Sequence, residues 1–260
     1  MSRAVFMLAL RLRLPVALAA GSGLIAVMVA VGALFPAVGH SIGALHVPRS
    51  VANMLGGADY GTVTGWFRSE IGAIYGPLLI GAVAITSAAA TLAGEEEERI
   101  LALILSYPVS RARLVLAKAL AVACLAATMA LATWLGLIAG VAAAGGGVTV
   151  AHMAALALQL AFFGFAAGAV AVCAAAVTGR RSLASGVASA IAVLGWLINS
   201  FAPLVGGLGW LKYLSLYYYY AGHDPLANGL WVVGLLALAA VSVLLCATGM
   251  AAIGRRDLRG

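Results

Sequence analysis

Six apolar stretches of roughly 20 residues or more alternate with short polar segments along the chain. A stretch of this length can cross the hydrocarbon core of a bilayer as an α-helix. Lipid offers no partner for backbone N–H and C=O groups, so only a helix satisfies them within each stretch. The pattern predicts an all-α integral membrane protein with one transmembrane domain over residues 1–260. The six predicted spans are residues 14–37, 71–93, 119–144, 153–177, 183–202 and 230–252.

Residues 1–15, MSRAVFMLALRLRLP, combine basic and apolar positions ahead of the first span. This composition imitates a secretory signal peptide, but the apolar run after Arg13 is too long for the core of one. Short helices that carry both kinds of residue lie in the headgroup region of a bilayer. We therefore expect an N-terminal interfacial helix in front of a first span that is retained.

The composition agrees with a membrane location, because 64% of the residues are hydrophobic and only 9% are charged. Soluble domains contain about 25% charged residues. Lys and Arg concentrate in the cytoplasmic loops of membrane proteins, so their distribution indicates the orientation. One side of the predicted bundle carries Arg3, Arg11, Arg13, Arg99, Arg111, Arg113, Lys118, Arg180, Arg181, Arg255, Arg256 and Arg259. The other side carries Arg49, Arg68 and Lys212.

This asymmetry predicts a multi-pass protein of the cytoplasmic (inner) membrane, with both termini in the cytoplasm. The net charge of +7 is then a signal of topology, and no nucleic-acid partner is expected. Glu70 and Lys118 stand only at the edges of predicted spans, whose interiors contain no charged residue. This argues against a carrier driven by protons or sodium ions. Spans without charge favour an amphipathic or lipid-like cargo over small ions.

The densest charge lies between the second and third spans, in GEEEERILALILSYPVSRARLVLAK at Gly94–Lys118. Glu95–Glu98 are predicted to begin a short helix, where the helix dipole favours negative charge. Glu95 and Arg99 stand four residues apart, in the order that favours an ion pair. Ile100–Leu105 is too short to cross a bilayer and too apolar for water, so it should lie along the inner membrane surface.

The rest of this stretch contains signals for a break and a new helix. Pro108 disfavours helix at the residue before it and ends the short segment. Ser110 is placed to cap the next helix. That helix carries Arg111, Arg113 and Lys118 at the level of the lipid headgroups. The sequence therefore predicts a rigid, amphipathic elbow with an acidic end that is exposed to the cytoplasm.

The acidic end has three interpretations. A solvated loop that only fixes topology explains the cations but not four glutamates, because acidic residues contribute little to orientation. A metal site would have only Glu95 and Glu98 on one helix face, whereas a hard cation takes six or more oxygen ligands. A docking element for a cytoplasmic partner explains the stretch best.

The segment GEEEERILALILSYPVSRARLVLAKALA resembles the first cytoplasmic loop of the type-2 ABC exporter permeases, which include drug, bacitracin and sodium-export-like members. The resemblance rests on the acidic run, the short Leu-rich helix, PVSR, and a basic residue followed by Ala-Lys. Many members have Gly-Thr where this chain has Ile100 and Leu101. The tract YYYYAGHDPLANG at Tyr217–Gly229 also resembles the segment before the last span in many of these permeases.

The resemblance implies a membrane permease subunit of an ATP-driven exporter, which forms the translocation path and couples to a separate ATPase. It implies a coupling helix between spans 2 and 3 and a smaller contact at Thr178–Ser182. The residues that it assigns to ATPase coupling are Glu95, Glu96, Glu97, Glu98, Arg99, Pro108, Ser110, Arg111, Arg180 and Arg181. The implied partners are two copies of an ABC ATPase subunit and a second permease subunit, with a homodimer expected.

Motifs for nucleotide binding and catalysis are missing from the sequence. A P-loop ends in Gly-Lys-Ser/Thr, and neither Lys118 in LAKAL nor Lys212 in WLKYL fits it. We expect ATP and Mg²⁺ on the partner ATPase and no cofactor on this chain. GxSxG and HExxH are absent too, and the histidines match no metal motif, so a transport subunit is predicted and not an enzyme. The alternative is an ATP-independent channel or an integral scaffold for a cytoplasmic partner.

Polar residues within the spans are candidates for a substrate path, although each could equally hydrogen-bond a neighbouring helix. They are Thr86, Ser87, Gln159, Asn199 and Ser200. The small-residue pairs Gly136/Gly140 and Gly164/Gly168 permit close approach of another helix. Tyr217–Tyr220 are predicted to form part of an aromatic belt at the outer interface, with a lid over the exit path as the alternative.

Overall fold

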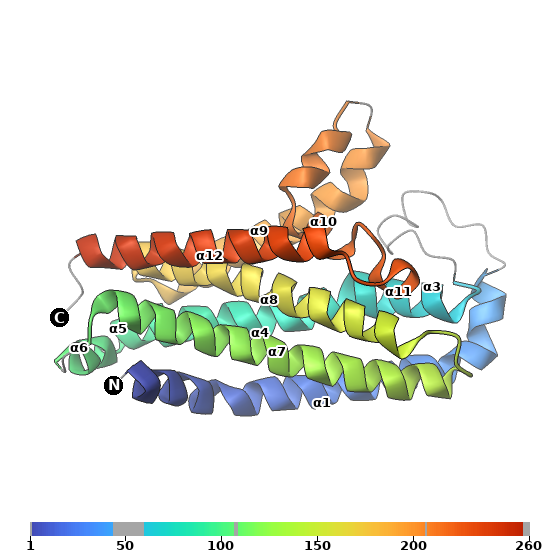
Figure 1. Ribbon diagram of the computed structural model, residues 1–260, viewed down its shortest axis with the longest axis horizontal. Coiled ribbons are helices and arrows are strands. Elements are labelled where there is room, and N and C mark those ends of the chain that lie inside the picture. The colour runs from blue at the N-terminus through green and yellow to red at the C-terminus, as the bar shows by residue number, and fades with distance from the viewer. Residues whose placement is uncertain (1, 44–59, 107–108, 206, 257–260) are drawn as a thin grey trace.

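The computed structural model describes residues 2–43, 60–106, 109–205 and 207–256. Its regular structure in these ranges is entirely helical, and six helical segments are long and apolar enough to cross a membrane. They lie lengthwise beside one another (Figure 1). The candidate spans are Arg3–Gly39, Val63–Glu97, Arg111–Ala143, Val150–Thr178, Arg181–Leu204 and Val232–Arg255. The prediction of an all-α protein with six transmembrane helices is therefore confirmed.

Long single helices form most of these spans. They are α1 (Ser2–Gly43), α7 (Arg111–Ala143), α8 (Val150–Thr178), α9 (Arg181–Phe201) and α12 (Val232–Arg255). The second span is a series of α- and π-helical segments: α3 (Val63–Phe67), η1 (Arg68–Tyr75), α4 (Gly76–Ala89), η2 (Ala90–Gly94) and α5 (Glu95–Glu97). Short helices connect the spans: α6 (Ile100–Leu105), η3 (Ala202–Leu204), η4 (Gly209–Leu214), α10 (Leu216–Ala221) and α11 (Pro225–Asn228).

The first helix differs from the prediction, because α1 continues through Pro15 and Pro36 without a break. The expected interfacial helix and the first span are thus one helix, and the position of its first turns in the headgroup region stays a prediction. Ala17, Leu24 and Met28 are buried on one face of α1, which packs along α7. This stripe, repeated at helical spacing, is what fixes α1 to the bundle.

The centre of the bundle is α8, which packs against α4, α7, α9 and α12. Glycines permit the closest approaches: a Cβ atom on Gly140 of α7 would collide with the Met28 carbonyl of α1. A Cβ atom on Gly168 of α8 would meet the Val122 side chain of α7 and stand 3.3 Å from Ala84. The prediction that these glycine positions mark close helix contacts is confirmed.

Pro77 controls how the second span is joined to α10. Proline has no N–H, so it cannot bond the carbonyl four or five residues earlier in an α- or π-helix. The carbonyls of Ala73 and Gly72, four and five residues before Pro77, accept hydrogen bonds from the hydroxyls of Tyr217 (3.0 Å) and Tyr220 (2.7 Å). Burial raises the pKa of both tyrosines, which keeps their hydroxyls protonated as donors. Lipid could not donate hydrogen bonds to these two carbonyls, and their donors come from tyrosines 144 and 148 residues away in the sequence.

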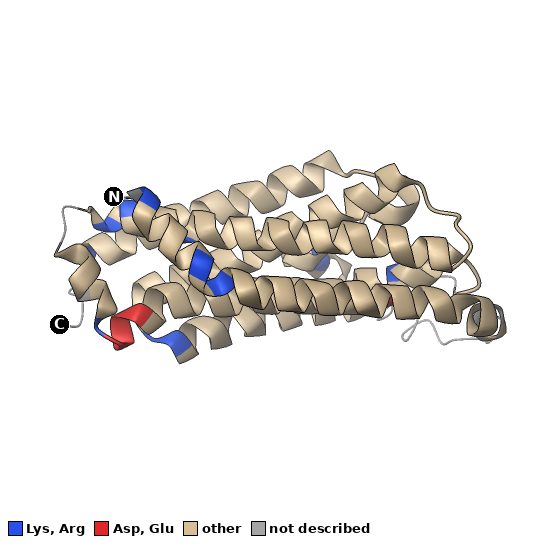
Figure 2. Ribbon diagram, turned by 90° about the horizontal axis from the view of Figure 1, so that it is seen from below, with Lys and Arg blue, Asp and Glu red and all other residues tan. Residues whose placement is uncertain are grey.

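The charges gather at one end of the bundle (Figure 2). The beginning of α1 and the end of α12 lie there, together with α5 and α6 (Figure 1). We call this end the terminal end. The opposite end, which carries α3 and α11, is called the distal end.

Replacing Gly140 with alanine should lower the thermal stability of the protein in mild detergent. The added methyl group would force α7 away from the α1 backbone, and overpacking of this kind costs about 1–3 kcal/mol. Gly186→Ala on α9 is the matched control, because nothing lies within 4 Å of a Cβ atom there. The unfolding midpoint, followed by intrinsic fluorescence, should fall for Gly140→Ala and hold or rise for the control. Equal midpoints would show that the α1–α7 contact is not this tight.

Candidate functional site

A buried ion pair joins the end of the second span to α7. Lys118 lies two turns into α7 and its side chain is 1% exposed. Its Nζ atom stands 2.5 Å from Glu95 Oε2 and also donates to the backbone carbonyl of Thr91. A buried ammonium group needs such partners, because taking it out of water uncompensated costs several kcal/mol. The pair therefore fixes α5 against α7.

A second ion pair joins the same segment to the end of α12. Glu96 is 1% exposed, and its Oε2 atom accepts a hydrogen bond from Arg256 Nη2. Gly179, which ends α8 with a left-handed φ of +60°, leaves the space for it. A Cβ atom on Gly179 would stand 2.8 Å from Glu96 Oε1 and would collide with the Arg256 guanidinium. Both the backbone conformation and the packing thus require glycine here.

Two further contacts extend this arrangement. Glu97 Oε1 accepts a hydrogen bond of 2.9 Å from the backbone N–H of Arg181, in the first turn of α9. The Arg111 guanidinium, at the start of α7, donates to the carbonyls of Ile253 (3.2 Å) and Arg256 (2.6 Å). We call these contacts together the ionic cluster: Glu95, Glu96, Glu97, Arg111, Lys118, the Arg181 N–H and Arg256. The cluster joins α5 to α7, α9 and α12.

This geometry corrects four expectations about the acidic run and the start of α7. Glu95–Glu97 end the second span and do not begin the short helix, which starts after a sharp turn at Arg99, where φ is +60°. Glu95 pairs with Lys118, 23 residues away, and not with Arg99. Lys118 is buried within the third span, so the spans are not free of charge, while its level relative to the lipid headgroups stays a prediction. The prediction of an acidic end fully exposed to the cytoplasm is wrong for Glu96, whose carboxylate is buried.

Other expectations for the elbow are met or lie outside the described residues. Ser110 does cap α7, since its Oγ atom accepts the Arg113 N–H at 3.4 Å. The short helix occupies the predicted residues Ile100–Leu105, while its placement on the membrane surface stays a prediction. Pro108 falls outside the described residues. Side chains from the predicted docking set that stay exposed are Glu97, Glu98, Arg99, Ser110, Arg180 and Arg181.

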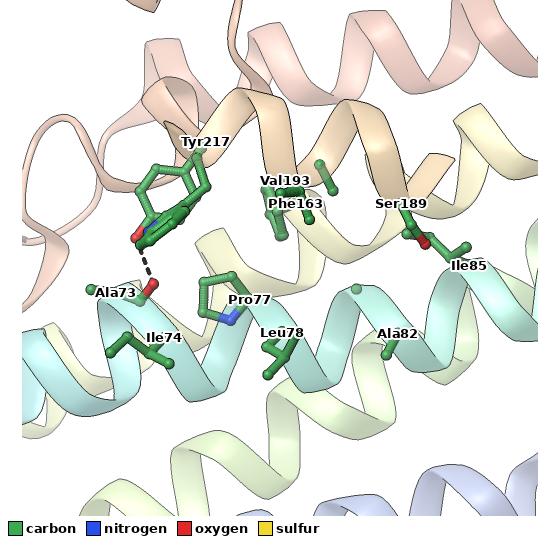
Figure 3. A pocket seen from close by; sticks show the side chains of 13 residues that line it. Ala73, Ile74, Pro77, Leu78, Ala82, Ile85, Phe163, Ser189, Val193 and Tyr217 are labelled. Atoms are coloured by element: carbon green, nitrogen blue, oxygen red, sulfur yellow. Dashed lines mark hydrogen bonds between the residues drawn. The ribbon is translucent and has the colours of Figure 1, made fainter. Parts of the chain in front are cut away.

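Nearer the distal end, two pockets open between the second span and α9. The first is an apolar groove of about 330 Å³ (Figure 3). Its lining includes Pro77, Leu78 and Ile85 from α4, Val193 and Trp196 from α9, and Phe163 from α8. The second is a polar pocket of about 240 Å³. Its lining includes Arg68 of η1, Asn199 of α9, and Asp224, Tyr217 and Tyr220 of the α10–α11 segment.

Of the predicted substrate-path residues, the structure brings only Asn199 to one of these two pockets. Thr86 is exposed and donates to the Ala82 carbonyl at 2.6 Å, while Ser87 and Ser200 are buried. Gln159 is buried in α8; its amide nitrogen lies 3.1 Å from the Tyr219 carbonyl and its oxygen 3.2 Å from the Trp231 N–H. Gln159 therefore supports the segment that leads into α12. A contact of any of the five with substrate stays a prediction.

The aromatic tract was also only partly foreseen. Tyr217 and Tyr220 are buried against the second span, so they belong to the core and not to an interfacial belt. Tyr218 and Tyr219 are half-buried and contact the ring of Trp231. Pro77, which withholds one helical N–H from the second span, is the signal that could have predicted a hydroxyl donor here.

Six helices long and apolar enough to cross a membrane define a multi-pass membrane protein, with two pockets on one side of its second span. Residues 16–215 match the family described as ABC-2 family transporter protein, and the chain belongs to this family. No curated protein matches the chain. Membership makes it a membrane permease component of an ABC transporter, not itself catalytic, and implies a role with an ABC ATPase partner.

The ionic cluster makes a prediction about stability. Lys118→Met should lower the free energy of unfolding by about 3–5 kcal/mol, because it leaves the partly buried Glu95 carboxylate without its cation. The double variant Lys118→Met/Glu95→Leu should recover most of the loss, since removing both partners of a buried pair is often nearly neutral. Unfolding midpoints in mild detergent measure both effects. A double variant no more stable than the single one would mean that Lys118 acts through Thr91 and not through the ion pair.

Proposed function

We propose that the chain is the permease subunit of an ATP-driven exporter, which provides the translocation path and couples to a separate ATPase. Two ATPase subunits, which bind ATP and Mg²⁺, would serve two permease subunits, and we propose that the second is a copy of this chain. The observation that carries the proposal is the ionic cluster. It connects the α5–α6 elbow to the ends of α7, α9 and α12.

The ionic cluster allows a displacement of the α5–α6 elbow to be transmitted to the other spans. A force applied to a flexible loop would be lost in the loop, whereas α5 continues directly from the second span. Its carboxylates bind groups on three other spans, so a displacement of the elbow moves four helix ends together. The glutamates thus transmit motion inside the subunit, and the exposed charges beside them are left to bind the ATPase.

The docking surface consists of exposed groups on both sides of the cluster. Glu98 and Arg99 lie on the turn before α6, and Arg180 and Arg181 lie at the start of α9. The N–H of Arg181 bonds Glu97, so the two loops stand side by side. Leu103 is 69% exposed on α6 and offers an apolar contact. We propose that the ATPase binds this mixed surface at the cytoplasmic face.

Orientation and assembly follow from the same features. The terminal end carries the excess of Lys and Arg (Figure 2), which supports cytoplasmic termini in an inner membrane. The outer face of α9 exposes Val187, Ile191 and Leu194. An apolar face of this kind suits a second permease subunit across the path as well as lipid. Export as the direction rests on the resemblance of the elbow to that of type-2 exporters.

Affinity purification from the native membrane in mild detergent tests the proposal. An ABC ATPase should co-purify with the unmodified chain. The variant Glu98→Gln/Arg99→Gln/Arg180→Gln should retain several-fold less ATPase, because it removes exposed charges and leaves the ionic cluster intact. Lys212→Gln, at the distal end, is the matched control and should retain all of it.

Unfolding midpoints of all three proteins should agree, so that lost ATPase reports on the surface and not on folding. If no ATPase accompanies the folded native chain, the transporter proposal fails, and a channel or scaffold takes its place. If the ATPase binds the triple variant as well as the native chain, the docking surface lies elsewhere on the terminal end.

A further inference from the structure

The apolar groove and the polar pocket are two compartments of one site. Ala73 and Tyr217 line both of them. Trp196 lines the groove and Asn199 lines the polar pocket, one turn further along α9. Figure 3 shows Tyr217 at one end of the groove, bonded to Ala73. The polar compartment therefore lies on the distal side and the apolar compartment extends from it toward the middle of the bundle.

The polar compartment contains an ion pair whose carboxylate is only half satisfied. Arg68 Nη1 donates to Asp224 Oδ2 at 2.7 Å, and the Asp224 side chain is 13% exposed. Asp224 Oδ1 is buried and has no hydrogen-bond partner among the described residues. A buried carboxylate oxygen without a donor is costly. A guanidinium has five N–H donors, so Arg68 can bind an anion while it holds Asp224.

The apolar compartment opens sideways from the bundle. Leu78 on α4 is 61% exposed and Val193 on α9 is 54% exposed, and both line the groove. Phe163 and Tyr217 are buried against each other, with ring centroids 6.2 Å apart, and form its inner wall. In a bilayer, such an opening faces the acyl chains of the surrounding lipid.

The two hydroxyls of the wall shared by the compartments have no proton left to donate to a ligand. The Tyr217 and Tyr220 hydroxyls are already committed to the carbonyls of Ala73 and Gly72. Polar recognition is therefore confined to the Arg68–Asp224 pair and the Asn199 amide. One cation, one unsatisfied carboxylate oxygen and an adjoining lateral apolar groove together specify an amphiphile with a headgroup of two opposite charges.

We propose that this site binds a phospholipid whose headgroup carries a phosphate and a primary ammonium group, as in phosphatidylethanolamine. The phosphate binds Arg68, the ammonium group donates to the Asp224 carboxylate, which lines the polar pocket, and an acyl chain occupies the groove. A choline headgroup has no N–H to donate, and a glycerol headgroup has no cation for the carboxylate. Naming this lipid as the cargo class rests on the proposed export function, whereas the binding site itself does not.

Native mass spectrometry of the full chain in detergent micelles tests the site. The probes are dioleoyl phosphatidylethanolamine, dioleoyl phosphatidylcholine and dioleoyl phosphatidylglycerol, which share the same acyl chains. Phosphatidylethanolamine should bind with about tenfold or more higher affinity than either of the others, because only it supplies a charge-assisted bond to Asp224. Soluble phosphorylethanolamine should not compete at the same concentrations, because it lacks the chain that fills the groove.

Variants separate the two compartments. Asp224→Asn should bring the affinities for the ethanolamine and choline lipids to within about twofold, while Arg113→Gln, at an exposed position at the start of α7, should change neither. Should Asp224→Asn fail to fold, Val193→Phe tests the groove from its exposed lip. It should lower the affinity for all three lipids and leave their ratios unchanged.

Equal binding of the three lipids by the native chain would overturn the headgroup assignment. Competition by phosphorylethanolamine would overturn the apolar half of the site. A spectrum that shows a lipid-free dimer, which Val193→Phe converts to monomer, would assign the groove to a second copy of the chain and overturn the proposal. These mass-spectrometry measurements need neither nucleotide nor ATPase. If the native chain binds the three lipids equally but an ATPase still co-purifies with it, the lipid site is rejected and the export proposal stands. Selective binding without an ATPase would instead reject the export proposal alone.

Discussion

A charge buried in a membrane helix must have a partner, and the terminal end is built around that requirement. Lys118 is buried in α7, and its ammonium group bonds Glu95 and the Thr91 carbonyl. Once Glu95 is fixed, the next two glutamates reach α12 and α9. A run that looks like a solvated knob is therefore also the point at which four spans are tied together.

At the distal end, the N–H group that Pro77 lacks has a comparable effect on how the helices are joined. Pro77 withholds one helical N–H from the second span, and the hydroxyls of two tyrosines from α10 bond the carbonyls of Ala73 and Gly72. The result is a fixed aromatic wall between α4 and α9, on which both compartments of the pocket depend. Backbone carbonyls that need donors thus organise the distal end, and a buried ammonium group that needs partners organises the terminal end. Apolar packing holds the long helices together between them.

The sequence predicts well whatever depends on neighbours along one helix. Span number, most span limits, the Ser110 cap and the short helix at Ile100–Leu105 follow from hydrophobic length and capping chemistry. It fails where partners come from distant spans. Glu95 has an ideal local partner in Arg99, yet the positive φ of Arg99 and the packing of α7 give it Lys118. Asp224, 156 residues from Arg68, could not be assigned to a pocket for the same reason.

The pairing of Glu96 with Arg256 also sets the order in which the ion pairs can form during biosynthesis. The carboxylate is synthesised early, at the end of the second span, and its cation comes 160 residues later, after the last one. Lys118, by contrast, follows Glu95 within 23 residues. During biosynthesis one contact can therefore close while the nascent chain is short, and the other only when α12 has been inserted. The later contact can form only after all six described spans have been synthesised, so it joins the last of these to the second.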